Sequence, residues 1–182
     1  MPLGLLQPHN TALLIIDIQE RLMPVIAESE TVFNNINKLI QGAQILNLPI
    51  LVTEQYPKGL GHTCPQLQLP EDQTIIEKSC FSCLLSDDVN ETLETLKIKS
   101  LIIAGTEAHI CVLKTALDAL QKQYDVHIIA DAVSSRTLQN KQLALDRMKQ
   151  SGAFISSVEI VLFQLLDYAG TDQFKQISKL IK

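Results

Sequence analysis

The sequence has no cluster of lysine or arginine residues. Its 15 basic side chains are outnumbered by 20 acidic ones, which gives a formal net charge of -5 at pH 7. A protein that binds nucleic acid or an anionic membrane surface normally presents a basic patch to the phosphate groups. We therefore expect neither nucleic acid nor a membrane as a partner.

Long hydrophobic runs and a cysteine framework are also lacking. The longest apolar runs are about six residues, whereas a bilayer-spanning helix needs about 20. The opening stretch, MPLGLLQPHN, has no basic region and no sufficiently long apolar segment, so we expect no secretory signal. The four cysteines show no regular spacing, which favours a reducing compartment and predicts a cytoplasmic location.

The composition is that of an ordinary globular protein, 46% hydrophobic and 19% charged, with no internal repeat or low-complexity segment. A chain of 182 residues is long enough to bury most of its apolar surface, and we interpret residues 1–182 as a single domain.

Short apolar runs alternate with segments of helical periodicity, which is typical of a parallel α/β sheet. We expect a three-layer α/β/α fold with a mostly parallel, Rossmann-like sheet of about six strands. The expected strands are Ala12–Ile16, Ile50–Thr53, Thr74–Glu77, Ser100–Gly105, Val126–Ala130 and Phe154–Ser156. The expected helices are Glu30–Asn47, Asp87–Lys97, Ile110–Lys122 and Asn140–Ser151, followed by two helices at the carboxyl end.

Three reactive residues follow three of these strands: Asp17, Lys78 and Cys111. Because parallel strands place their carboxyl ends at one edge of a sheet, where ligands bind, we expect these side chains to meet. An acid, an ammonium and a thiol are the groups that a cysteine nucleophile needs together with its base and its electrostatic support.

Each of the three residues also has a plainer interpretation. Cys111 at a helix start would be favoured as a thiolate by the helix dipole and would have free backbone N–H groups nearby, but most lone cysteines are buried structural thiols. Partial burial would raise the pKa of Asp17 toward that of a general base, but such an acid can simply cap a helical turn. Lys78 can pair with Asp17 or be solvated.

The segment from Glu54 to Gln73 interrupts the alternation of strands and helices, because three prolines and two glycines break any regular element there. A loop of about 20 residues in a compact domain is usually functional. We therefore interpret this segment as a lid or a wall of the pocket and not as a surface loop without a function.

Four motifs resemble those of the isochorismatase-like cysteine hydrolases, in the same order over roughly residues 10 to 165. They are the strand-Asp-x-Gln opening that ends at Gln19, the Lys-x-x-Phe-Ser pattern from Lys78 to Ser82, Gly-x-Glu-Ala-His-Ile-Cys-Val from Gly105 to Val112, and Asp-Ala-Val-Ser-Ser-Arg from Asp131 to Arg136. The stretch from Glu54 to Gly61 is similar to that of the isochorismatase-domain proteins within this family.

The resemblance implies a strand order of 3-2-1-4-5-6 and a catalytic triad without a cofactor. Cys111 would attack a carbonyl-type carbon, Asp17 would take the thiol proton and later activate water, and Lys78 would lower the thiol pKa and hold Asp17. The resemblance also implies a cis peptide between Thr106 and Glu107, which would aim the backbone N–H groups of Glu107 and Cys111 at an oxyanion.

The sequence departs from the family pattern at two places, and these departures narrow the range of reactions that we expect. Family nicotinamidases carry an Asp-x-His metal site after the second strand, where this chain has Glu54-Gln55-Tyr56; His62 is the only histidine nearby, so we expect no metal. True isochorismatases do not use a nucleophilic cysteine at the position of Cys111. The pattern therefore favours hydrolysis of a small amide, carbamoyl or related C–N bond.

Other candidates carry weaker signals. Cys80 and Cys83 form a C-x-x-C that is typical of a redox dithiol or half a zinc site, with Cys64 and His62 as remaining ligands, but we favour two small side chains packed beneath Lys78. We also expect the substrate pocket to include Gln19, Tyr56, Phe81 and His109, of which Tyr56 and Phe81 can equally be core residues.

The rival hypotheses for the whole chain are a catalytically idle scaffold that binds a partner or metabolite in the same pocket, and a thiol redox sensor. Family members commonly assemble, so the resemblance also implies a homo-oligomer, dimeric or larger. The apolar side chains near the carboxyl end are a candidate contact surface or a cover for the core: Phe174, Ile177, Leu180 and Ile181.

Overall fold

The computed structural model describes residues 3–182, which are built around one six-stranded sheet. All neighbouring strands pair in parallel, in the order β3-β2-β1-β4-β5-β6, which confirms the predicted sheet and its strand order. The strands are β1 (Thr11–Ile16), β2 (Ile50–Gln55), β3 (Ile75–Lys78), β4 (Ser100–Thr106), β5 (Asp125–Ser134) and β6 (Phe154–Ser156).

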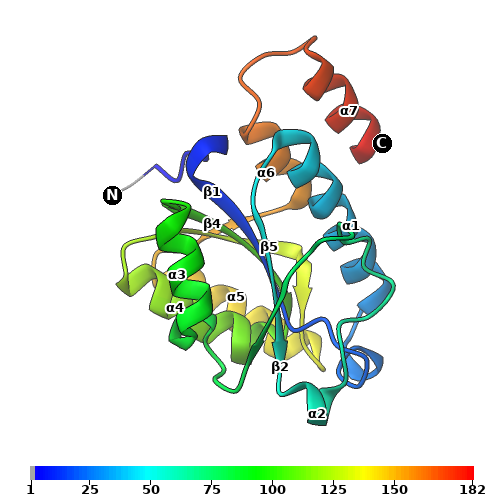
Figure 1. Cartoon of the computed structure of the whole chain (residues 1–182), viewed down its shortest axis with the longest axis vertical. Coiled ribbons are helices and arrows are strands. Elements are labelled where there is room, and N and C mark those ends of the chain that lie inside the picture. Colours follow the sequence, from blue (N-terminus) through cyan, green and yellow to red (C-terminus); the bar gives the residue numbers. More distant parts are fainter. Residues whose placement is uncertain (1–2) are drawn as a thin grey trace.

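Helices cover both faces of the sheet, so the fold is the predicted three-layer α/β/α arrangement. Figure 1 shows α1, α6 and α7 on one side and α3, α4 and α5 on the other. The helices are α1 (Ser29–Leu46), α2 (Pro57–Leu60), α3 (Asp87–Thr95), α4 (Leu113–Gln121), α5 (Leu138–Gln150), α6 (Val158–Gln164) and α7 (Asp172–Ile181). Short 3-10 turns lie at Pro8–Asn10, Met23–Val25 and Cys83–Leu85.

Strand β1 shows why the sequence reads as an unbroken apolar run. All six of its residues are buried, because helices cover both faces of the sheet at this central strand. Leu13 and Ile15 pack into the core beneath α1 and α6, while Leu14 and Ile16 pack into the core beneath α3 and α4. Two hydrophobic cores therefore hold the end of β1, where Asp17 follows, in a fixed position.

Most predicted elements lie within two residues of the observed ones, but β5 continues to Ser134, four residues past its expected end. Asp131 consequently lies inside the strand and not after it. Its carboxylate accepts a hydrogen bond from the backbone N–H of Val158 at 3.1 Å, and its carbonyl oxygen accepts one from Asn35 at 2.6 Å. Asp131 thus ties β5 to the start of α6 and to α1.

The helix expected over Ile110–Lys122 is in fact two elements. A π-helical turn spans Ala108–Val112, and α4 begins only at Leu113. Cys111 therefore lies inside the π turn. Single π turns are rare and are frequently found at functional sites.

The segment from Glu54 to Gln73 is less irregular than its prolines and glycines predict. Strand β2 takes up its first residues as far as Gln55, and α2 adds one helical turn. The buried Gln19 side chain fastens this part of the loop: its Nε2 donates to the carbonyl oxygens of Gly61 at 2.7 Å and Gln55 at 3.1 Å, and its Oε1 accepts from the Gln55 N–H at 2.8 Å. Residues 55–61 therefore form a fixed wall beside the sheet edge.

At the carboxyl end, α7 packs against α1, with Ile177 fully buried in the core (Figure 1). Its apolar stripe therefore serves at least in part as a cover for the core, one of the two roles considered for it. No helix within residues 3–182 is both long enough and apolar enough to cross a membrane.

Candidate active site

Three strand ends bring Asp17, Lys78 and Cys111 together. Asp17 follows β1, Lys78 is the last residue of β3, and Cys111 lies in the turn after β4. Strand β2 separates β1 from β3, so the long Lys78 side chain spans the end of β2 and places its Nζ 2.7 Å from Asp17 Oδ2. Both of these side chains are completely buried.

The backbone at Asp17 is held in an uncommon conformation. Its φ of 51° lies in the left-handed region, which non-glycine residues adopt rarely and mostly where surrounding contacts impose it. Thr106 Oγ1 donates a 2.8 Å hydrogen bond to the Asp17 carbonyl oxygen, and Thr53 Oγ1 donates one of 2.8 Å to Asp17 Oδ1. Strand β4 thus holds the backbone of Asp17, and β2 orients its carboxylate.

Gly105 allows β4 to approach β1 at the same level. Its φ is 123°, and a Cβ at this position would collide with the backbone of Ile16. Only glycine fits such a close backbone approach. The next residue, Thr106, is joined to Glu107 by a cis peptide bond.

The Lys78 ammonium is fully engaged by polar atoms around it. Besides Asp17 it donates to Gln55 Oε1 at 2.9 Å and to the Cys80 carbonyl oxygen at 3.3 Å. Burial disfavours the charged form, but the Asp17 carboxylate and the nearby thiols outweigh burial and leave the Lys78 pKa above its ordinary value. Lys78 is therefore a permanent positive charge at this site.

The pKa values of Asp17 and Cys111 are both raised. Burial raises the pKa of the Asp17 carboxyl, although the Lys78 charge opposes this effect. Burial also raises the pKa of the Cys111 thiol, and the negative charge of Asp17 raises it further, while Lys78 lowers it. The depressed thiol pKa expected from the sequence is wrong for the resting site, because burial and the adjacent carboxylate outweigh the lysine. The thiol is neutral and stands beside a base.

Asp17 and Cys111 open onto one cavity of about 260 Å³. The cavity has five apolar side chains in its walls: Leu22, Val25, Leu60, Phe81 and Ile110. Its remaining lining residues are Gln55, Glu107 and Arg136. An apolar cavity that ends on a few convergent polar groups is the usual form of a small-molecule site.

The structure places the four predicted pocket residues differently. Phe81 lines the cavity, whereas Gln19, Tyr56 and His109 are not among its lining residues. Gln19 is turned to the loop backbone, Tyr56 is 58% exposed, and His109 Nδ1 lies 2.9 Å from Ser135 Oγ. The other four apolar wall residues were missed, because nothing in their local sequence distinguishes them from core residues.

Arg136 was noticed only as part of a motif, yet it reaches the site. Its Nε and its backbone N–H both donate to Glu107 Oε2, each at 3.1 Å. The Glu107 side chain is almost completely buried, so this ion pair offsets the cost of burying its charge. The pair joins the end of β5 to the turn that carries Cys111.

Of the two C-x-x-C cysteines, Cys83 is packed in the core and Cys80 is half-buried, and all four cysteines of the chain are free. Cys83 is fully buried, with its Sγ 3.7 Å from Thr53 Oγ1, and burial raises the pKa of its thiol to about 11. Within residues 3–182, no group of three or more His, Cys, Asp or Glu side chains is arranged to hold a metal ion. His62, which was considered as a zinc ligand, has its Nδ1 3.3 Å from Glu54 Oε2.

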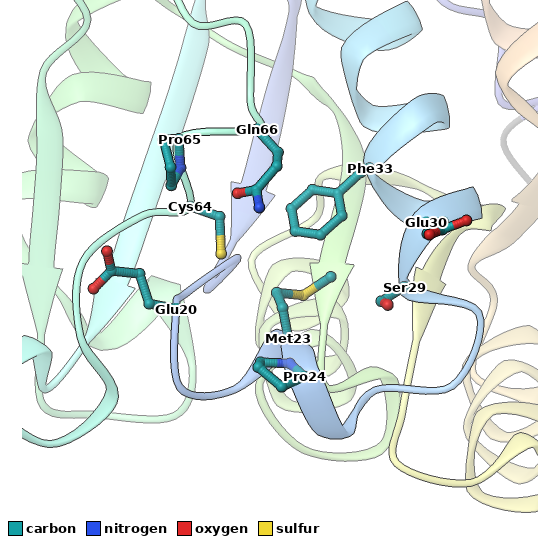
Figure 2. A pocket seen from close by; sticks show the side chains of 9 residues that line it. All are labelled: Glu20, Met23, Pro24, Ser29, Glu30, Phe33, Cys64, Pro65 and Gln66. Carbon is teal, nitrogen blue, oxygen red and sulfur yellow. The ribbon is translucent and has the colours of Figure 1, made fainter.

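A second and larger cavity, of about 560 Å³, lies on the α1 side of the residues that follow β1. Figure 2 shows the Cys64 thiol and the Phe33 ring facing this space, with Met23 and Glu20 nearby. Burial and the Glu20 charge raise the pKa of Cys64 to about 11, and this cavity has no lysine or arginine in its lining, whereas Arg136 lines the smaller cavity. The smaller cavity, which holds both Asp17 and Cys111, is therefore the candidate active site.

Comparison with known proteins places the chain in a family. The isochorismatase domain model matches residues 11–160. The chain belongs to the isochorismatase family. It is 42% identical to the secreted isochorismatase effector Isc1 of Phytophthora sojae, over 99% of this chain and 88% of that protein.

Two solved structures of family relatives have the same fold. The MAR1 ribonuclease of Caenorhabditis elegans superposes with a TM-score of 0.91 at 38% identity, covering 97% of this chain and 91% of that one. The YcaC gene product of Escherichia coli, described as an octameric hydrolase of unknown specificity, superposes with a TM-score of 0.92 at 26% identity, covering 100% and 91%.

Proposed function

We propose that this isochorismatase-family protein is a cysteine hydrolase that cleaves a small amide, carbamoyl or related C–N bond. The observation that carries the proposal is that Asp17 and Cys111 line one small cavity, while the buried Lys78 lies 2.7 Å behind the Asp17 carboxylate. A fully buried ion pair is costly to keep, so its presence beside a thiol at a ligand-binding edge supports a catalytic role.

In the first half of the reaction, the Cys111 Sγ attacks the carbonyl carbon while Asp17 takes the thiol proton. The raised pKa of the Asp17 carboxyl suits a base that must accept a proton near neutral pH. The C–N bond then breaks, and the amine or ammonia leaves with the proton from Asp17. The acyl group remains on Cys111 as a thioester.

In the second half, Asp17 removes a proton from water, and the resulting hydroxide attacks the thioester carbon. The C–S bond breaks, the acid is released, and the sulfur recovers its proton from Asp17. Lys78 stays charged throughout and holds the carboxylate oxygen at 2.7 Å. The backbone N–H groups of Glu107 and Cys111 stabilise the oxyanion in both halves.

The substrate is a small molecule and no cofactor takes part. A cavity of only about 260 Å³ in a chain of net charge -5 favours this substrate over RNA, the substrate class implied by the name of the C. elegans relative. We also propose that the chain forms a homo-oligomer, which the octameric relative and the exposed apolar side chains of Val25 and Phe81 at the cavity support. The four free thiols support a reducing, cytoplasmic compartment.

The test is ammonia release from a panel of primary amides and N-carbamoyl compounds, with an RNA oligonucleotide included. Cys111→Ala should lower turnover by about a thousandfold or more, because it removes the nucleophile. Cys80→Ser, the matched control at a half-buried cysteine nearby, should keep wild-type turnover. Intact-protein mass spectrometry should find an acyl adduct on the wild-type chain only. Wild-type turnover by Cys111→Ala would refute the proposal, and an inert Cys111 would favour the idle scaffold.

A further inference from the structure

Cys83 is a buried thiol that the proposed reaction does not use. It begins the short 3-10 turn Cys83–Leu85 after β3, and its side chain lies in the core beneath α3 and α4 with no exposed surface. Burial raises the pKa of the thiol to about 11, so Cys83 is neutral and keeps one proton to donate. Cys83 is not among the residues that line the active-site cavity, so any role in the reaction is exerted through other side chains.

The Cys83 thiol is the first member of a chain of hydrogen bonds that ends on the base. Its Sγ lies 3.7 Å from Thr53 Oγ1, a distance at which a thiol can form a hydrogen bond. The Thr53 hydroxyl has one proton and donates it to Asp17 Oδ1 at 2.8 Å, because an ionised carboxylate can only accept. Toward Cys83 the Thr53 oxygen is therefore the acceptor, and the thiol is the donor.

Cys83 is itself held in place by the helix that follows the nucleophile. Its backbone N–H donates to Thr115 Oγ1 at 2.9 Å. Thr115 belongs to α4 and lies about one helical turn after Cys111. Thr53 and Thr115 are as completely buried as Cys83, so bulk water does not compete for these bonds. The hydrogen bonds of Cys83 thus connect the base to the helix that carries on from the nucleophile.

We propose that Cys83 is a positioning residue for Asp17: its thiol orients the Thr53 hydroxyl, and that hydroxyl fixes the orientation of the carboxylate. This inference rests on the proposed function, because it assigns a role in the same reaction. Lys78 holds the other carboxylate oxygen, Oδ2, at 2.7 Å. The terminal torsion of a free aspartate is broad, so two fixed oxygens confine the base to one orientation toward Cys111.

The test follows the side-chain carboxyl signal of Asp17 through a pH titration by carbon-13 NMR, with Asp17→Asn to assign the signal. Burial raises the pKa of Asp17, and the hydrogen bond from Thr53 is among the interactions that oppose this rise. Thr53→Val keeps the shape of the side chain and removes the hydroxyl, so the pKa of Asp17 should rise further, by about one unit. Thr53→Ser keeps the hydroxyl and should leave the pKa close to its wild-type value.

A double-mutant cycle separates a role through Thr53 from packing alone. Cys83→Ala should raise the pKa of Asp17 by about 0.3 to 0.5 units, because a thiol is a weak donor and acts through the hydroxyl. This effect should disappear in the Thr53→Val background, because the chain of hydrogen bonds is already broken there. Cys83→Ser keeps a donor and should restore the wild-type pKa. Cys64→Ala is the matched control, because it removes a buried thiol from the other hydrophobic core and should leave the pKa of Asp17 unchanged.

Urea unfolding checks that each variant is folded, and Cys83→Val, which fills the space without a donor, replaces Cys83→Ala if the latter does not fold. Neither Cys83 nor Thr53 lines the cavity, so kcat for the best substrate of the amide panel should fall while KM stays unchanged. The expected fall in kcat is about tenfold for Thr53→Val and about twofold to threefold for Cys83→Ala.

Two results would overturn the inference: an Asp17 pKa that does not respond to the loss of the Cys83 thiol, or one that responds equally with and without the Thr53 hydroxyl. The expected pKa shifts in a protein that turns over no amide would instead refute the proposed function, while confirming that Cys83 acts on Asp17 through Thr53. The two failures are distinguishable because the NMR titration does not depend on turnover.

Discussion

Replacing Lys78 with methionine tests whether the buried pair contributes to the free energy of unfolding as its geometry requires. The two side chains are completely buried and 2.7 Å apart, so the change leaves the Asp17 carboxylate without its counter-ion. Breaking a buried pair by removing one partner typically costs about 3–5 kcal/mol. The variant keeps much of the side-chain volume, so the loss reports charge more than packing.

The pH dependence of this loss follows from the protonation of Asp17. Burial already raises the pKa of this carboxyl, and removing the Lys78 charge would raise it further. A carboxyl whose pKa is higher in the folded than in the unfolded chain destabilises the fold as the pH rises above the unfolded value of about 3.9. The deficit of Lys78→Met should therefore shrink as the pH falls from 7 toward 4.

The assay is urea unfolding of wild type and Lys78→Met from pH 5 to pH 8. Lys175→Met is the matched control: its ammonium is 3.1 Å from Asp172, but the lysine side chain is 66% exposed, so the loss should stay below about 0.5 kcal/mol. The double variant Asp17→Asn/Lys78→Met should recover at least about half of the deficit, because no buried charge is left alone. A deficit in Lys78→Met below about 1 kcal/mol, or one that does not change with pH, would refute the reasoning.

Two further changes test the electrostatics of the molecule. Asp17→Asn should shift the pH dependence of iodoacetamide alkylation at Cys111 to lower pH, because the Asp17 carboxylate raises the thiol pKa. Lys78→Met should shift it to higher pH, because the Lys78 charge lowers the thiol pKa. Shifts of both variants in the same direction would contradict this account. Burial lowers the pKa of His127 to about 4, below its unfolded value of about 6.5, so its stabilising contribution of about 3 kcal/mol is complete above pH 6.5 and is lost as the pH falls toward 4. His127→Phe should reduce the decrease in the free energy of unfolding at acid pH, measured by urea unfolding, since neither ring nitrogen has a partner within residues 3–182 and the ring stacks on Phe154. An unchanged decrease would show that another group is responsible.

The strand ends were the most predictable part of the site. A buried strand is predicted by a short apolar run in the local sequence. Because the strands are parallel, the polar residue that follows each of them lies at the same edge of the sheet. That is why the sequence alone predicts Asp17, Lys78 and Cys111 as site residues. The resemblance of the motifs to one family supplied the strand order, which periodicity alone does not contain.

Side chains whose roles depend on distant partners were less predictable. Gln19 was expected in the pocket but fastens the loop at Gly61, a contact between residues 42 positions apart. The pKa of Cys111 was expected to be low from the nearby lysine and helix start. The extent of burial and the proximity of Asp17, which reverse that expectation, appear only when four strands are placed side by side.

The sequence by itself determined the alternation of strands and helices and the residues at three strand ends, because hydrophobic periodicity and chain reversals are local properties. Only the tertiary structure decided which of those ends share one cavity, how deeply the Asp17–Lys78 pair is buried, and that Arg136 lines the same cavity as Cys111. These properties depend on desolvation and on distances between segments far apart along the chain. Both are set by the packing of the whole molecule, and local residue patterns do not encode them.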